Sequence, residues 1–244
     1  MEFAFAAAAI FVASFVQGLT GFGSGIIALT LLAMMWEIQF VVAITAVFSI
    51  FICLYLAWRL WEHIRFSEIL PLLAGAAIGV PLGVMALTRL DPRIIKGCLG
   101  VFLMAYAVWS LLSKEQERPP ISKTWAFPSG MGAGLLSGAF NTGGPPVVLY
   151  GNERQWSPNA FRGNIQGFFA PCAALTLTLY ALNGVITRDT LAWNLKLFPF
   201  LIVGMVIGDR LAAGVQPGPF RKILLLSLLA VGVVFLRAFF LPDP

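Results

Sequence analysis

The sequence predicts an all-α polytopic membrane protein. Hydrophobic residues make up 59% of the 244 residues and charged residues only 11%, whereas soluble domains carry about 25% charged residues. The mean hydropathy is +0.87. A helix that crosses the hydrocarbon core needs roughly 20 apolar residues, so the chain has room for at most about ten spans. We therefore expect its function to reside within the bilayer.

Six segments have the length and apolar composition of single membrane spans. They are 40–58, 69–88, 94–112, 165–182, 190–208 and 223–241. Two further apolar segments, 3–36 and 127–150, are interrupted by glycine and polar residues. The interruptions run from Gly18 to Gly25 and from Asn141 to Pro146. We expect each of these two segments to form a broken hairpin.

The two interruptions belong to an internal repeat. Gly79 and Gly83 recur as Gly204 and Gly208, 125 positions later, and the glycines of the first interruption correspond to the second at an offset of 120. The repeat predicts two halves, 1–118 and 119–244, each a glycine-rich hairpin followed by three spans, within one transmembrane domain. The four-residue spacing of the repeated glycines is also typical of close helix packing, and we favour that interpretation for these four residues.

The distribution of Lys and Arg favours hairpins that return to the side they came from. In that arrangement the two sides carry ten and five basic residues, whereas two crossing segments would give seven and eight. Cytoplasmic loops are enriched in Lys and Arg, so we expect inverted repeats with the N-terminus outside and the join at 113–124 in the cytoplasm. The ten are Arg59, Arg65, Lys114, Arg118, Lys123, Arg154, Arg162, Arg210, Arg221 and Lys222, and the five are Arg89, Arg93, Lys96, Arg188 and Arg237.

The interruptions bring polar backbone groups to membrane depth, where protein or a water-filled cavity must satisfy them. In transporters with inverted repeats, the N-termini of broken helices face anionic groups. Neither interruption contains an acidic residue, and Gly143-Gly144-Pro145-Pro146 is typical of a helix start. We expect an anion site between the interruptions, formed by Thr20, Gly21, Gly23, Ser24, Asn141, Thr142, Gly143 and Gly144.

The interruptions resemble the paired signatures of the TauE/SafE sulfite exporter family, also known as 4-toluenesulfonate uptake permeases. The residues concerned are Gly18-Leu-Thr-Gly-Phe-Gly-Ser-Gly25, and Ser137-Gly-Ala-Phe-Asn-Thr-Gly-Gly-Pro-Pro146 followed by Arg162-Gly163-Asn164. Ser24 stands where a further glycine is usual in that family. The resemblance implies a secondary carrier of the bacterial cytoplasmic membrane that moves sulfite, an organosulfonate such as sulfoacetate, or another sulfur-containing anion.

Several charged residues are candidates for function. Arg162, with Asn164 beside it, precedes a span and could pair with a sulfonate, and the alternative is a cytoplasmic anchor. Glu37, Lys196 and Asp209 are candidates for coupling to protons or cations. The alternatives are snorkelling to the interface for Lys196 and an interfacial ion pair for Asp209.

Other classes of function fit the sequence poorly. There is no HExxH motif, Cys/His cluster or carboxylate pair inside a span, so we expect no catalytic residue, metal or cofactor. Dispersed Lys and Arg residues do not indicate nucleic acid binding. The remaining alternatives are a carrier of a carboxylate or an inorganic oxyanion and a membrane assembly protein, and the architecture is compatible with a homodimer.

Overall fold

The computed structural model describes residues 2–91 and 119–212, with scattered positions between 94 and 108 and between 229 and 236. The chain divides into two compact units. The first comprises Met1–Thr88 and Pro120–Gly214, and the second comprises Arg89–Pro119 and Val215–Pro244. The scattered positions are helical and belong to the second unit. The predicted spans 94–112 and 223–241 also belong to this unit, and most of their residues lie outside the described part.

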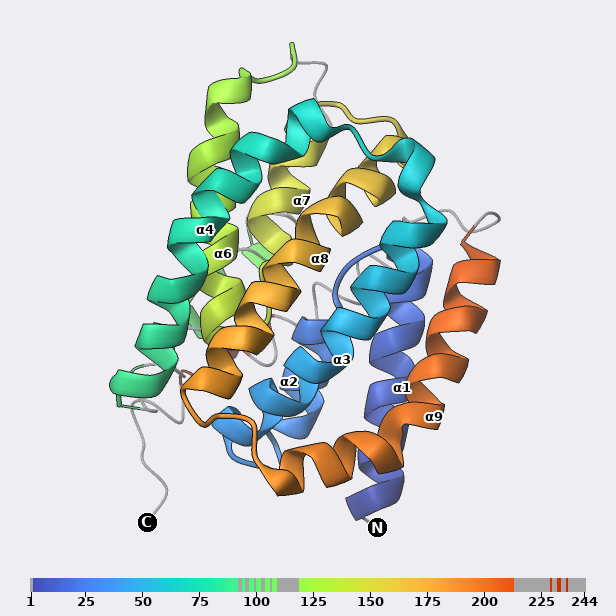
Figure 1. Cartoon of the computed structure of the whole chain (residues 1–244), viewed down its shortest axis with the longest axis vertical. Helices are drawn as coiled ribbons and strands as arrows, with labels where there is room; N and C mark the ends of the chain where they lie inside the picture. Colours follow the sequence, from blue (N-terminus) through green and yellow to red (C-terminus); the bar gives the residue numbers. More distant parts are fainter. Residues whose placement is uncertain are drawn as a thin grey trace. The chain divides into compact units, whose positions relative to one another are not determined.

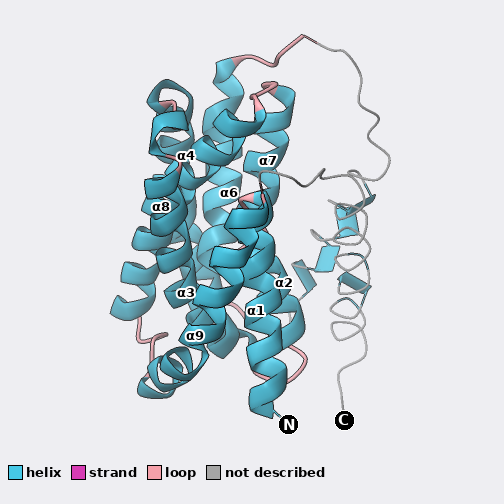
Figure 2. Ribbon diagram, turned by 90° about the vertical axis from the view of Figure 1, so that its right-hand side faces the viewer, coloured by secondary structure: helices cyan, strands magenta, loops and turns pink. Residues whose placement is uncertain are grey.

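The described residues form helices and no strand (Figure 2). The helices described in the first unit are α1 (Glu2–Thr20), α2 (Ser24–Leu32), α3 (Ile38–Arg59), η1 (Trp61–His63), α4 (Phe66–Arg89), η2 (Lys123–Trp125), α6 (Ala126–Phe140), α7 (Gly144–Glu153), α8 (Pro158–Leu182) and α9 (Arg188–Leu211). Among the described helices, α1, α3, α4, α8 and α9 are long and apolar enough to cross a membrane. The predicted spans 40–58, 69–88, 165–182 and 190–208 are thus confirmed as apolar helices.

The first broken segment changes direction at residues 21–23, which we call the first break. Gly21 has φ +88° and Gly23 has φ +101°, conformations that glycine adopts without a steric penalty. The Thr20 hydroxyl lies 2.9 Å from the Val16 carbonyl oxygen and 2.8 Å from the Phe22 carbonyl oxygen, and its single hydrogen can be donated to either. α1 ends at Thr20, within the interruption predicted from the sequence.

The second break, residues 141–143, is built differently. Asn141 ends α6 in the left-handed region, at φ 54°, which asparagine tolerates better than most residues. Its N–H group donates to the Ser137 carbonyl at 2.8 Å. The next helix, α7, begins at Gly144, with Pro145 and Pro146 in its first turn, where proline fits because no intrahelical partner for its nitrogen is needed. The predicted helix start is confirmed.

Each broken segment ends beside the place where it began. The indole nitrogen of Trp36, beyond α2, donates to the Glu2 carboxylate at the start of α1, at 2.6 Å. At the other segment, the Ile121 nitrogen donates to the Glu153 carbonyl at 3.1 Å, and Arg154 Nη1 donates to the Ile121 carbonyl at 2.7 Å. Figure 1 shows α1 with α2 and α6 with α7 as neighbouring pairs. The chain therefore folds back at both breaks.

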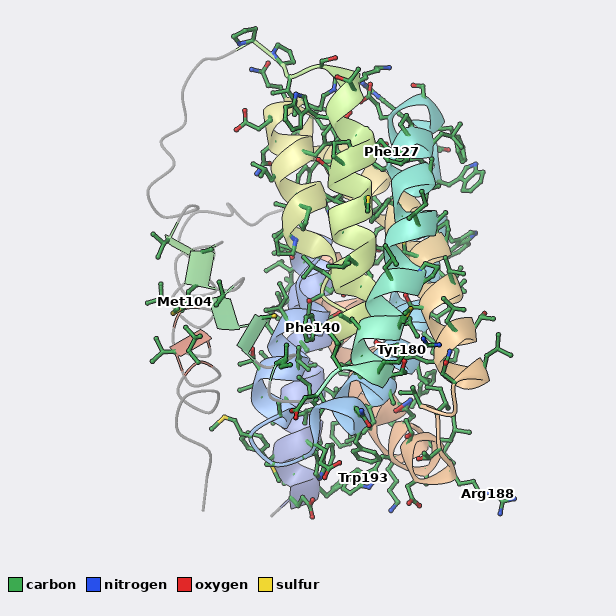
Figure 3. The ribbon with its side chains drawn as sticks, turned by 90° about the vertical axis from the view of Figure 1, so that its left-hand side faces the viewer. Met104, Phe127, Phe140, Tyr180, Arg188 and Trp193 are labelled. Atoms are coloured by element: carbon green, nitrogen blue, oxygen red, sulfur yellow. The ribbon has the colours of Figure 1, made fainter. Side chains whose placement is uncertain are left out.

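The two broken segments start at opposite ends of the first unit. Trp36 packs against Trp193 near the start of α9, with ring centroids 4.7 Å apart. Arg154 pairs instead with Glu68 near the start of α4, at 3.1 Å. Figure 3 shows Phe127, near the start of α6, and Trp193 at opposite ends of this unit.

Glycines allow α4 to pack directly on α6 and α9 on α1. A Cβ atom at Gly79 would overlap with the Met131 carbonyl oxygen, and one at Gly208 would overlap with the Phe15 carbonyl oxygen. Small residues permit this close approach of helix backbones. The packing role is confirmed for the four repeated glycines, Gly79, Gly83, Gly204 and Gly208, each of which faces a backbone carbonyl of the neighbouring helix.

Candidate functional site

The two breaks line one cavity of about 40 Å³. This volume holds about three water molecules, which is the size range of a small oxyanion. The first broken segment contributes Gln17, Gly23, Ser24, Gly25 and Ile26, and the second contributes Ser137, Asn141, Thr142, Gly143 and Gly144. The walls are Ser49 and Cys53 from α3, and Phe169, Cys172, Ala173 and Thr176 from α8.

Side-chain hydrogen bonds fix both broken segments against α3. Asn141 Nδ2 donates to the Ser49 hydroxyl at 2.7 Å. The Ser24 hydroxyl donates to Gln17 Oε1, and Gln17 Nε2 donates to Cys53 Sγ at 3.5 Å. The polar parts of the two segments are thus held on the same side of α3, where the cavity lies.

Close backbone contacts explain two of the glycines at the cavity. Gly25 lies against the Asn141 carbonyl oxygen, so that a Cβ atom there would overlap with the second break. A Cβ atom at Gly143 would overlap with Ser137 Oγ and lie 2.5 Å from the Ala133 carbonyl oxygen. The first contact joins the two broken segments, and the second keeps α6 and α7 together.

The cavity is polar but not charged, because none of the described residues that line it has a charged side chain. Thr142 and Thr176 are 2% and 0% exposed, and their hydroxyl oxygens have no hydrogen-bond partner within the described part of the protein. A buried unpaired polar group costs about 1–3 kcal/mol. The first N–H groups of α2 and α7 also lack intrahelical acceptors and lie at the positive ends of helix dipoles. This chemistry suits a small anion.

The structure brings six of the ten predicted binding residues together at the cavity. These six are Gly23, Ser24, Asn141, Thr142, Gly143 and Gly144. The other four, Thr20, Gly21, Arg162 and Asn164, are not among the lining residues. Thr20 caps α1, and Gly21 faces α8. Asn164 accepts a hydrogen bond from the Arg65 nitrogen at 2.7 Å and so ties the start of α8 to the residues before α4.

Arg162, on α8, contacts the end of α1 just before the first break and forms an ion pair with Asp209, one of the predicted coupling candidates. Its Nη2 donates to the Gly18 carbonyl oxygen at 2.9 Å and to Asp209 Oδ1 at 3.2 Å. The other carboxylate oxygen of Asp209 accepts from the Tyr55 hydroxyl at 3.3 Å and from Arg59 Nε at 3.4 Å. Arg162 and Asp209 therefore belong to one network that spans α1, α3, α8 and α9.

The other two coupling candidates lie away from the cavity. Glu37 is exposed and occupies the position before α3. Lys196 is exposed on α9, with its Nζ 5.3 Å from the centroid of the Trp193 ring, a cation–π geometry. Within the described residues, no group of three or more His, Cys, Asp and Glu side chains is placed to hold a metal ion.

A second charged cluster lies where the second broken segment begins and ends. Glu68 is 7% exposed, and its Oε1 lies 3.0 Å from Lys123 Nζ and 3.1 Å from Arg154 Nη2. Trp156 Nε1 donates to Oε2 at 3.4 Å. The hydrogen bond to Glu68 raises the pKa of Arg154 above its ordinary value, so this guanidinium stays charged. The sequence had assigned Arg154 only to a side of the membrane.

Sequence reasoning missed the contributions of α3, α8 and the last turn of α1. Ser49 and Cys53 are four residues apart, as are Cys172 and Thr176, so each pair shares one helix face. Such spacing of small polar residues within apolar helices could have identified them. Cys53 and Cys172 are buried free cysteines, and both line the cavity. Gln17 lies one turn before the first break, outside the interruption that we considered.

Similarity to known proteins extends over almost the whole chain. The family described as Sulfite exporter TauE/SafE matches residues 6–235. The probable inner membrane transporter protein TsaS of Comamonas testosteroni is 26% identical over 175 residues, which are 71% of this chain and 73% of that protein. The probable sulfite/organosulfonate exporter TauE of Cupriavidus necator is 23% identical over 226 residues, 90% and 88% of the two chains. No solved structure shows significant similarity.

Proposed function

The chain belongs to the sulfite exporter TauE/SafE family, and from this premise we propose that it carries a small sulfur-containing anion across the bacterial cytoplasmic membrane. Members of the family are membrane transporters and not enzymes. The substrate class is sulfite or an organosulfonate such as sulfoacetate, in line with the relative from Cupriavidus necator, which is described as a sulfite/organosulfonate exporter. The protein acts as a secondary transporter by alternating access.

The observation that carries this proposal is the uncharged cavity shared by the two breaks. The anion binds there between the N-termini of α2 and α7, and the buried hydroxyls of Thr142 and Thr176 donate to its oxygens. A site made of neutral donors suits an anion that must also leave, because no fixed buried charge is left unpaired when the site empties. We assign the remaining contacts to the backbone N–H group of Ser24, the side-chain amide of Asn141 and the backbone of Gly143 and Gly144.

We further propose that the broken segments are re-entrant hairpins of two inverted halves, 1–118 and 119–244. Three features support this. The chain folds back at both breaks, the two segments start at opposite ends of the first unit, and glycines pack α4 on α6 as they pack α9 on α1. Backbone that is neither helix nor sheet is tolerated at membrane depth where it lines a cavity. In this topology the N-terminus lies outside and the join at 113–124 is cytoplasmic.

The topology can be tested by labelling single introduced cysteines with a membrane-impermeant thiol reagent and assigning the modified peptides by mass spectrometry. In intact cells, hairpins that return predict that Glu115→Cys and Ser157→Cys are both protected and that Asp91→Cys is labelled. Crossing segments would instead place position 157 on the side opposite to position 115. A labelled Ser157→Cys beside a protected Glu115→Cys therefore excludes the re-entrant arrangement.

Export of an anion can follow the inside-negative membrane potential, whereas uptake needs a co-transported proton or cation. Coupling through Glu37, Lys196 or Asp209 stays a prediction. Imposed voltage and pH gradients across proteoliposomes distinguish these cases, because uncoupled export responds to voltage alone.

The function is tested by flux in proteoliposomes loaded with sulfite, sulfate, thiosulfate, sulfoacetate or acetate. We expect saturable movement of a sulfur anion and none of acetate. Thr176→Val removes the unpaired hydroxyl at nearly constant volume and should raise KM by about tenfold, since a hydrogen bond to a charged group contributes about 1.5–3 kcal/mol.

Thr178→Val is the matched control, because Thr178 lies on the same helix, is exposed, and within the described part of the chain donates only to the Ala174 carbonyl of its own helix. Its KM should equal that of the wild type. Equal KM values for both variants would show that the Thr176 hydroxyl does not bind the substrate. Acetate flux without sulfur-anion flux would mean that the substrate is a carboxylate and not a sulfur-containing anion.

A further inference from the structure

We propose that Arg162 and Gln166 of α8 are positioning residues that hold the first break in the shape required by the anion site. This inference rests on the proposed function, because it takes the cavity as the binding site. Arg162 then acts through the backbone of α1 and does not touch the anion.

The last carbonyl groups of a helix have no intrahelical donors and carry partial negative charge, and within a membrane they need donors from the protein. At the end of α1 those donors come from α8. Arg162 Nη2 donates to the Gly18 carbonyl at 2.9 Å, and Gln166 Nε2 donates to the Gly21 carbonyl. The two side chains are four residues apart and therefore share one face of α8.

Asp209 keeps the Arg162 guanidinium in this position. The side chain of Asp209 is 6% exposed and that of Arg162 is 20% exposed, while Arg59, the other arginine on Asp209, is 54% exposed. A cation at a helix C-terminus is stabilised by the helix dipole, and the carboxylate balances the buried charge. Among the described residues, Asp209 would retain only the exposed Arg59 as a charged partner if Arg162 were removed.

The capped end of α1 leads directly to the cavity. Gln17 precedes Gly18, and its amide bonds to both Ser24 at the start of α2 and Cys53 on α3. A displacement of Gly18 therefore moves the side chain that fixes the start of α2. Arg162 is two contacts away from the cavity, which makes it a positioning residue and not a ligand.

The same helix also caps the second broken segment. The Tyr180 hydroxyl donates to the Gly138 carbonyl near the end of α6, at 2.7 Å, and Figure 3 shows Tyr180 at the height of Phe140, the last residue of α6. Thr176, between these two caps, lines the cavity. α8 thus donates hydrogen bonds near the C-terminal ends of both α1 and α6, and it also contributes to the site between the two broken segments.

Cys53 provides a native reporter of the end of α1, because its thiol is buried and accepts the hydrogen bond from Gln17. We would measure N-ethylmaleimide labelling of Cys53 by peptide mass spectrometry in the purified full-length protein, without substrate. Arg162→Gln should be labelled about tenfold faster, because labelling of a buried thiol follows local opening. Arg162→Lys keeps the charge and should fall between Arg162→Gln and the wild type, in both labelling and flux.

Arg59→Gln is the matched control, because Arg59 also contacts Asp209, and no hydrogen bond among the described residues joins its side chain to α1. It should leave Cys53 labelling and flux at wild-type values. The double variant Arg162→Asp/Asp209→Arg restores an ion pair but presents an acceptor to the Gly18 carbonyl, so we expect no rescue of either readout. Rescue by this exchange would reduce Arg162 to a simple ion-pair partner and overturn the capping role.

The labelling readout separates this inference from the proposed function. Faster labelling of Cys53 in Arg162→Gln supports the capping role even if no sulfur anion is transported. Unchanged labelling with a raised KM would make Arg162 a ligand of the anion and overturn the inference. Should Arg162→Gln fail to fold, Gln166→Met, which removes the donor to the Gly21 carbonyl together with the rest of the side-chain amide, should still label faster than the wild type. Wild-type labelling of this variant would also overturn the inference.

Discussion

The first and second breaks reverse the chain for different local reasons. In the first, Gly21 and Gly23 adopt φ values of +88° and +101°, so glycine is needed for its backbone conformation. In the second, Asn141 takes the left-handed position, and Gly143 has an ordinary φ of −67°. Gly143 is glycine because Ser137 and α6 leave no room for a Cβ atom. Similar glycine-rich motifs can therefore meet different physical requirements.

The two breaks also offer different donors to the cavity. The start of α2, from Ser24 to Ile26, presents three backbone N–H groups, whereas Pro145 and Pro146 in the first turn of α7 have none. The second break compensates with side chains, the Thr142 hydroxyl and the Asn141 amide. We infer that the first break binds through its backbone and the second largely through its side chains. Substitutions of Gly21 and Gly23 in the first break should then act through geometry, and those of Asn141 and Thr142 in the second through chemistry.

The largest effect is expected where the two broken segments touch. Gly25→Ala places a methyl group on the Asn141 carbonyl oxygen, and overpacking of this kind costs about 1–3 kcal/mol. We expect transport to be lost and the Tm in detergent to fall by about 5 °C. Gly132→Ala is the control, because among the described residues its added methyl group has only Pro146 Cγ near it, at 3.9 Å. Wild-type flux in Gly25→Ala would show that the contact is not needed for transport.

A smaller change in Tm is expected where each broken segment begins and ends. Within the described residues, the second segment is held there by a charged cluster and the first by a single hydrogen bond. Glu68→Gln leaves Arg154 and Lys123 without their carboxylate, and we expect the Tm to fall by about 4 °C. Glu2→Gln keeps an oxygen that accepts from Trp36, so its Tm should change by less than about 1 °C. Thermal unfolding followed by tryptophan fluorescence measures both. Equal shifts in the two variants would mean that the negative charge of Glu68 stabilises the protein no more than that of Glu2.

Much of this architecture could be predicted from the sequence, because hydropathy alone identifies the four spans that became α3, α4, α8 and α9. The breaks were also predictable, since glycine and proline act locally on the backbone. The partners within the site were not. Asn141 bonds to Ser49, 92 residues away, and no local pattern encodes that contact. Arg162 was predicted as a ligand because of its charge, but only the fold shows that it faces the end of α1.

The finest distinction between the breaks lies in how each tolerates asparagine. Gly23→Asn should be less harmful than Gly23→Ala, because asparagine adopts the left-handed conformation that costs alanine about 1–2 kcal/mol. At Gly143 the limit is space, so Gly143→Asn should be at least as harmful as Gly143→Ala. The Tm values of the four variants measure this, and we expect alanine and asparagine to differ by about 3 °C at position 23. The same order of asparagine and alanine at both positions would show that one requirement governs both breaks.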